Sequence, residues 1–224
     1  MLKFKIQLLS AICLAALLPA NGYGLDAASV DEYKSVATGR AEKIVTGMQL
    51  ADPAIARKLV EVIAGQYCDL FAIHEIRDAA LKQLTEYDHG FESLNRLARE
   101  GIEAGAREAV DNAHRQFVAR VESLVGSDGL EAVKNGMTYH VAPNTYGVYM
   151  QMLPDLDDEG KALIKAWLWE AREYAMDAGS SDEKHKWFGK YKGRINNYLS
   201  SRGVDLKEAE RAMWARLKEE KTSP

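Results

Sequence analysis

The sequence predicts an all-α protein, in which a long antiparallel helical hairpin is packed on a C-terminal helical subdomain. Three observations support this fold class. Apolar residues recur at spacings of three and four along most of the chain, which is the helical period. No segment shows the apolar–polar alternation of a strand. Helix-start signals, acidic or hydroxyl residues that can cap a first turn, precede most of the periodic segments.

The first 24 residues have the composition of a secretory signal peptide. A short lysine-containing segment precedes the apolar run Ile6–Leu18, and small residues follow that run. The apolar run is short for a transmembrane span, so we expect cleavage after Gly22 or Gly24. The predicted location is then periplasmic or secreted, and an uncleaved N-terminal anchor is the alternative. Residues 25–224 are predicted to form a single all-helical domain.

A helical hairpin is predicted over about residues 53–124, after a first helix at about 30–46. Asp52 and Pro53 form a strong start signal, a capping carboxylate followed by proline at the first helical position. A turn at 88–90 separates the two long helices.

The second helix of the hairpin is rich in small residues, among them Gly105 and Ala109. Small side chains let two helices approach closely, so we expect this segment to form the seam of the hairpin.

The C-terminal part is predicted to contain an aromatic loop over 137–154 and then helices over 157–220. Pro143 interrupts the first of these segments, which argues for an ordered loop with one or two helical turns. Asp157, Ser180 and Asp205 each stand where a capping side chain is expected before a helix.

Composition excludes several functional classes. The formal net charge is −4, and it becomes −6 if the two lysines of the signal peptide are removed. A strongly basic footprint, which nucleic-acid binding normally requires, is therefore missing. The sequence contains no nucleotide-binding glycine loop, no Ser-hydrolase elbow and no cysteine-based metal motif, so no cofactor is expected.

Residues 182–198 are the most unusual segment, with five basic residues against two acidic ones and four aromatic residues among them. Lysine and arginine can pair with a carboxylate or sulfate, and flat rings can stack on a sugar, so an acidic glycan or oligosaccharide is the expected ligand. The alternative is an amphipathic helix with core aromatic residues and solvated lysines. The predicted ligand-binding residues are Trp187, Tyr191, Lys192, Arg194 and Asn196, together with Tyr146 from the aromatic loop.

Three residues are candidates for catalysis: His74, Tyr139 and His185. A tyrosine or histidine beside a cation could remove the α-proton of a uronate and so support lyase-type β-elimination. His74 and Asp78 have the spacing of two metal ligands on a helix, with His140 or His185 as a third. A buried hydrogen-bond network around His74 is the favoured interpretation, so no metal site is predicted.

Five segments together resemble a known family: Arg40–Val45, Gly65–Asp78, Val133–Tyr139, Thr145–Pro154 and Ala171–Ser200. They are similar to the exported bacterial domain-of-unknown-function family 3826. That family is met mainly in Bacteroidetes-type bacteria that degrade polysaccharides. The resemblance implies export and a glycan-related role, and it supplies no catalytic residues.

The functional expectation is thus an exported protein that binds or processes acidic polysaccharide. A lyase acting on uronate-containing glycans is one alternative. A periplasmic helical chaperone or structural protein is another, because Leu156–Gly160 faintly resembles a Leu-Thr-x-x-Gln signature of envelope-stress chaperones.

Overall fold

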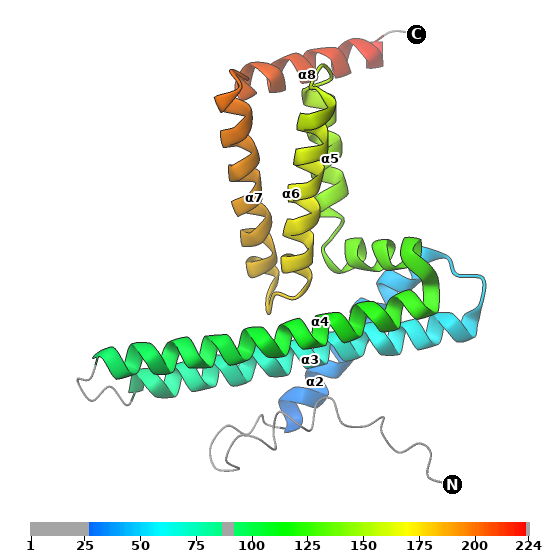
Figure 1. Cartoon of the computed structure of the whole chain (residues 1–224). Coiled ribbons are helices and arrows are strands. Elements are labelled where there is room, and N and C mark those ends of the chain that lie inside the picture. The colour runs from blue at the N-terminus through cyan, green and yellow to red at the C-terminus, as the bar shows by residue number, and fades with distance from the viewer. Residues whose placement is uncertain (1–26, 87–91, 223–224) are drawn as a thin grey trace. The chain divides into compact units, whose positions relative to one another are not determined.

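A computed structural model describes residues 27–86 and 92–222. These residues are almost entirely helical and contain no strand, which confirms the all-α prediction. The predicted signal peptide at 1–24 lies outside the described residues. The helices, labelled in Figure 1, are α2 Ala27–Met48, α3 Pro53–Glu86, α4 Glu92–Met137, α5 Val141–Met152, α6 Asp158–Met176, α7 Ser181–Ser201 and α8 Leu206–Thr222.

The described residues divide into two compact units, one ending at Ser127 and the other beginning at Asp128, and each is described by itself below. The prediction of one domain over 25–224 stays a prediction. Helix α4 contributes to both units, and Gly126 inside it has φ 71° and ψ −178°. Glycine adopts a positive φ at little cost because it has no Cβ. The range of α4 therefore comprises two helical segments, one before Gly126 and one after it, which meet at a kink.

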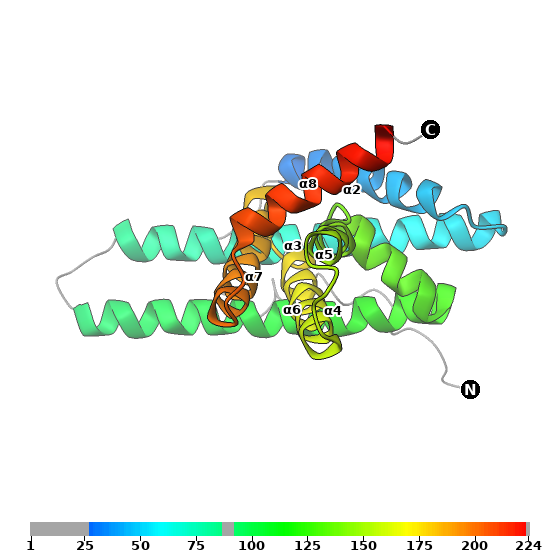
Figure 2. The ribbon, with the colours of Figure 1, turned by 90° about the horizontal axis from the view of Figure 1, so that it is seen from above.

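The first unit contains the hairpin. Helices α3 and α4 run antiparallel and side by side, and α2 packs on α3 (Figures 1 and 2). Tyr33 of α2 stacks on Phe71 of α3 with ring centroids 4.1 Å apart. The core of the unit is drawn from all three helices and includes Ala37, Ala41, Leu59, Ile63, Leu70, Phe117 and Val121.

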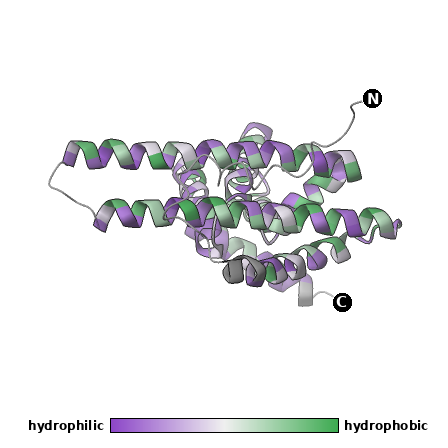
Figure 3. Ribbon diagram, turned by 90° about the horizontal axis from the view of Figure 1, so that it is seen from below, coloured by the Kyte–Doolittle hydropathy of each residue, from purple (hydrophilic) through white to green (hydrophobic). Residues whose placement is uncertain are grey.

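The part of the hairpin that contains the end of α3 and the start of α4 is less buried than the rest of the first unit. Within 75–86 and 92–112 no side chain is fully buried, and hydrophilic and hydrophobic residues alternate along both long helices (Figure 3). Gly105 is exposed, and a Cβ placed on it would meet nothing within 4 Å. The expectation that Gly105 lies in a close helix–helix seam is thus wrong, because the seam there is not closed around it.

The second unit is built on the antiparallel pair α6 and α7. Helix α5 packs on α6, and α8 crosses the ends of α5 and α7 (Figure 1). The core stripe of α7 recurs every three or four residues, as an amphipathic helix requires. Its members are Phe188, Tyr191, Ile195 and Leu199, which meet Ile164 and Leu168 of α6.

The segment expected to be an aromatic loop is largely the helix α5. Pro143 is its third residue, and the first backbone hydrogen bond of the helix comes from Asn144 N to His140 O at 3.1 Å. Proline is tolerated in a first turn because the N–H that it lacks has no partner there. The turn before α5 is made by Tyr139 and His140, whose φ angles are 57° and 56°.

Candidate functional site

Helix α7 presents two separate polar flanks on either side of its buried stripe. Lys192 and Asn196 lie one turn apart on one flank, whereas Trp187 and Arg194 lie on the other. At 100° per residue these two pairs are nearly opposite each other around the helix axis. The structure therefore does not bring all the predicted ligand-binding residues into one site.

The first flank lines a groove where α5, α7 and α8 meet, all within the second unit. Its volume is about 380 Å³, which falls in the range of small-ligand sites. We call it the lysine groove, and its lining residues are Thr145, Val148, Tyr149, Met152, Lys192, Asn196, Leu206, Lys207 and Glu210.

One side chain of the lysine groove is held by a buried phenol. The hydroxyl of Tyr149 donates to Asn196 Oδ1 at 2.6 Å, and Tyr149 is only 6% exposed. Burial raises the pKa of the Tyr149 hydroxyl above its usual value, so the group remains a proton donor. With Oδ1 of Asn196 occupied, the amide nitrogen remains available to donate to a ligand.

The electrostatics of the groove favour an anion. The ammonium groups of Lys192 and Lys207 make no ion pair with any residue that the structure describes. Glu210 is the carboxylate among the lining side chains. Two lysines against one glutamate leave a net positive charge in a concave site, which concentrates the field there.

The second flank of α7 packs on α6. Trp187 stacks on Tyr174 with centroids 4.6 Å apart, and Lys190 lies 5.0 Å from the Trp187 ring centroid. Arg194 lies 4.6 Å from the centroid of Trp167 and 3.9 Å from Glu170. These ring faces are already covered by protein groups, so the flank offers less stacking surface than the sequence pattern indicated.

Two predicted ligand-binding residues belong to the packing of the second unit. Tyr191 is 6% exposed, and burial, with the nearby Glu170, raises its pKa to about 12. Tyr146 meets Trp169 edge to face at 6.1 Å between centroids. Their positions account for their aromatic character without a ligand.

The three catalytic candidates are divided between the units. Tyr139 stacks on His185 with ring centroids 5.9 Å apart, and His185 Nδ1 lies 2.7 Å from the carbonyl oxygen of Ser181. His74 is on α3 in the first unit. Asp78 forms an ion pair with Arg77 at 2.7 Å. Within the described parts of the chain, no three histidine, cysteine or acidic side chains are grouped as metal ligands would be.

The second unit also contains a buried ionic network that is not among the residues predicted from the sequence. Arg172, 1% exposed, pairs with Glu131 through two hydrogen bonds and also donates to Asn135 Oδ1 at 2.9 Å. Lys184 is 6% exposed, and its Nζ donates to the carbonyl oxygens of Met137 and Met176 at 3.3 and 3.2 Å. Most of these residues lie in segments that carry the family resemblance, so those segments serve structure. The signal that could have found Arg172 is its register, since it follows Leu168 by four residues and precedes Ala175 by three, on the apolar face of α6.

Together the geometry defines an all-α protein whose second unit carries a concave cationic groove formed by three helices. The chain belongs to the family DUF3826, described as "Protein of unknown function", which matches residues 34–219. No curated protein sequence matches it. Over the residues described, none of the helices combines the length and apolar character needed to span a membrane.

Proposed function

We propose that the protein is exported and binds acidic oligosaccharides in the lysine groove without chemical conversion. The observation that carries this proposal is the pair of ammonium groups, Lys192 and Lys207, that line a concave site without an ion-pair partner among the described residues. Ammonium groups form charge-assisted hydrogen bonds with carboxylate and sulfate groups, and these bonds are stronger than neutral ones.

The remaining lining residues suit a sugar ring. Asn196 and Thr145 can donate to hydroxyl groups, and the side chains of Val148, Met152 and Leu206 offer an apolar surface to ring C–H groups. Val148 is 51% exposed, so its side chain is accessible to a ligand in the groove. A mixture of an apolar floor and a few polar groups is the ordinary composition of a small-molecule site.

Retention on a polyuronate resin at low salt tests the proposal. Lys192→Met and Lys207→Met should each reduce retention, because a charged contact is lost while the lysine stem is replaced by a similar apolar volume. Arg194→Met is the matched control, since Arg194 lies on the opposite flank of α7 and is exposed. Thermal unfolding should be nearly unchanged in all three variants.

Two results would reject the proposal. One is equal loss of retention in the Arg194 and Lys192 variants, which would indicate attraction by the whole basic helix. The other is absence of retention of the wild-type protein on every acidic glycan tested. In that case suppression of aggregation of an unfolded client protein would favour the chaperone alternative.

The lyase alternative rests on the Tyr139–His185 pair. A hydrogen bond from Nδ1–H to Ser181 O would leave Nε2 of His185 as a proton acceptor. His185 precedes Lys192 by two helical turns, or about 10 Å along the helix axis. A uronate lyase would produce an unsaturated uronate that absorbs in the ultraviolet, and His185→Gln would abolish this signal. Substrate that binds but never yields the signal supports the non-catalytic proposal.

Export is tested separately at the N-terminus. The mature protein isolated from its native host should begin at Tyr23 or Leu25, as cleavage after Gly22 or Gly24 requires. A soluble protein that retains Met1 would contradict this part of the proposal.

A further inference from the structure

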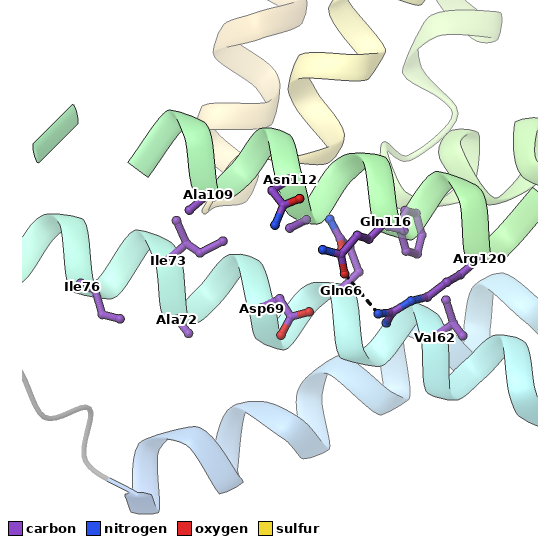
Figure 4. A pocket seen from close by; sticks show the side chains of 12 residues that line it. Val62, Gln66, Asp69, Ala72, Ile73, Ile76, Ala109, Asn112, Gln116 and Arg120 are labelled. Carbon is purple, nitrogen blue, oxygen red and sulfur yellow. Dashed lines mark hydrogen bonds between the residues drawn. The ribbon is translucent and has the colours of Figure 1, made fainter. Parts of the chain in front are cut away.

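A second cavity lies in the first unit, between the two long helices α3 and α4, and it opens to solvent on the side of α4 (Figure 4). Its volume is about 120 Å³. Five polar side chains line it: Gln66 and Asp69 from α3, and Asn112, Gln116 and Arg120 from α4. The rest of its wall is apolar, with Ile73 and Phe117 among the larger side chains. We call it the amide cavity, and nothing in the lysine groove depends on it.

The best-buried polar group of the amide cavity is the side chain of Gln66. This residue is 4% exposed, and its Nε2 has no hydrogen-bond partner among the described residues. Figure 4 shows the side chain extending from α3 into the space between the helices. A buried amide donor without an acceptor costs free energy, so its retention calls for an acceptor that occupies the cavity.

A carboxylate and a guanidinium face the same space. Asp69 is half-buried and forms no hydrogen bond or ion pair with the described residues, and burial raises its pKa while nearby Arg120 acts in the opposite direction. Arg120 Nη2 donates to Gln116 Oε1 at 3.2 Å. A guanidinium has five N–H donors, so most of those of Arg120 remain available.

The size of the cavity limits the ligand. The volume of the amide cavity is about 120 Å³. An engineered cavity of about 150 Å³ accepts benzene, which has six non-hydrogen atoms. The amide cavity therefore suits a molecule of about five or six non-hydrogen atoms.

We propose that the amide cavity binds a small zwitterionic α-amino acid of the size of glycine or alanine. Its ammonium group pairs with the Asp69 carboxylate, and its carboxylate accepts from Arg120 and from Gln66 Nε2. The α-carbon and a methyl side chain meet the apolar wall near Ile73 and Phe117. The carboxylate of Asp69 and the guanidinium of Arg120 match the two opposite charges of such a ligand. A ligand with a single charge would leave one of these two protein groups without a partner.

Titration calorimetry on the purified full chain, with thermal unfolding as a second readout, tests the proposal. The probes are L-alanine and glycine, with acetate and methylamine as controls that carry one of the two charges each. Alanine or glycine should release or absorb heat with one-site stoichiometry and raise Tm, whereas each control should bind at least about tenfold more weakly because one charge-assisted contact is missing.

Variants then locate the site. Arg120→Met and Gln66→Leu should each weaken binding of alanine at least about tenfold, and Arg115→Met, an exposed change on the same helix outside the cavity, should leave it unchanged. Gln66→Leu should also keep or raise the Tm of the ligand-free protein, because it removes the buried donor. Arg120 is exposed, so its variant provides the test even if the Gln66 variant does not fold.

Three outcomes would overturn the proposal. The first is no heat and no Tm change with any probe, which would mean that water alone fills the cavity. The second is binding of acetate as tight as that of alanine. The third is undiminished binding of alanine in the Arg120→Met protein.

Discussion

The guanidinium of Arg172 and the carboxylate of Glu131 form two parallel hydrogen bonds, Nη1 to Oε2 at 2.8 Å and Nη2 to Oε1 at 2.7 Å. The indole Nε1 of Trp169 donates to the same carboxylate at 3.0 Å. This pair joins the last turns of α4 to α6 within the second unit. The bonds from Arg172 also hold the pKa of Glu131 below its usual value, against the opposing effect of burial.

We predict that Arg172→Met destabilises the second unit by about 1.5–3 kcal/mol, because Glu131 and Asn135 lose their donor while the Glu131 side chain stays 45% exposed. Arg194→Met is the control, since its ion pair with Glu170 is exposed and such pairs contribute about 0–1 kcal/mol. Urea unfolding followed by circular dichroism measures both. A loss below about 1 kcal/mol for Arg172→Met would show that the network adds little to stability.

We predict that any side chain at Gly160, near the start of α6, lowers the stability of the protein. A Cβ there would lie 2.9 Å from Asp157 Oδ1 and 2.9 Å from Leu156 Cδ1. Asp157 Oδ1 cannot easily move, because it accepts from Gly160 N at 2.9 Å and from Arg202 Nη1 at 3.0 Å. Gly160→Ala should destabilise by about 1–3 kcal/mol through this overlap. Gly189→Ala on α7, where a Cβ meets nothing within 4 Å, is the matched change and should not destabilise.

The acid dependence of stability should include a contribution from Asp157. Hydrogen bonds from Arg202 and from the Gly160 amide lower its pKa from 3.8 to about 2. A lowered pKa stabilises the fold above the unfolded-state value, and this stabilisation is lost as pH falls from about 4 toward 2. Asn can still cap the helix but carries no charge, so Asp157→Asn should remove that part of the acid dependence.

Thermal unfolding from pH 2 to 6 measures the effect. The Tm difference between wild type and Asp157→Asn should be constant at the upper end and shrink toward the lower end. Asp155→Asn, two residues away and without an ion pair among the described residues, should follow the wild-type profile. Parallel profiles for wild type and the Asp157 variant would argue against the assigned pKa.

Replacement of glycine by alanine should raise the stability of the protein at one position and lower it at another, because the two glycines differ in backbone conformation. Gly105 is exposed inside α4, so Gly105→Ala should stabilise by about 0.5–1 kcal/mol through helix propensity. Gly203 has φ 81° and ends α7, so Gly203→Ala should destabilise by about 1–2 kcal/mol. If Gly105→Ala instead destabilises the protein, the result would support close packing of α3 and α4 at Gly105.

Local signals made the helices predictable. Asp52 accepts from Ala54 N at 2.7 Å, Ser180 from Glu183 N at 3.2 Å, and Asp205 from Glu208 N at 3.0 Å. Each of these capping bonds closes over two or three residues, so the sequence contains all that the bond needs. The helix α5 was not predictable from Pro143, because proline interrupts a helix interior but is tolerated in a first turn.

The candidate site was only partly predictable. Lys192 and Asn196 were identified together because they lie one helical turn apart, and they do line one groove. Helical spacing places Trp187 and Arg194 on a second stripe of the same helix, and in the structure α6 occupies that flank. Residues of α8 such as Lys207 gave no signal, since a single lysine after a capping aspartate is common on any helix.

The sequence by itself determined the helical class of this protein and the starts of most helices, because periodicity and capping depend on neighbours within about one turn. Only the tertiary structure decided which cations are buried and which face a groove. Lys184 and Lys192 are eight residues apart in one basic segment, yet the first bonds two backbone carbonyls and the second lines the lysine groove. Their partners come from other helices, as Tyr149 reaches Asn196 across 47 residues, and packing between helices fixes such pairs without leaving a local pattern.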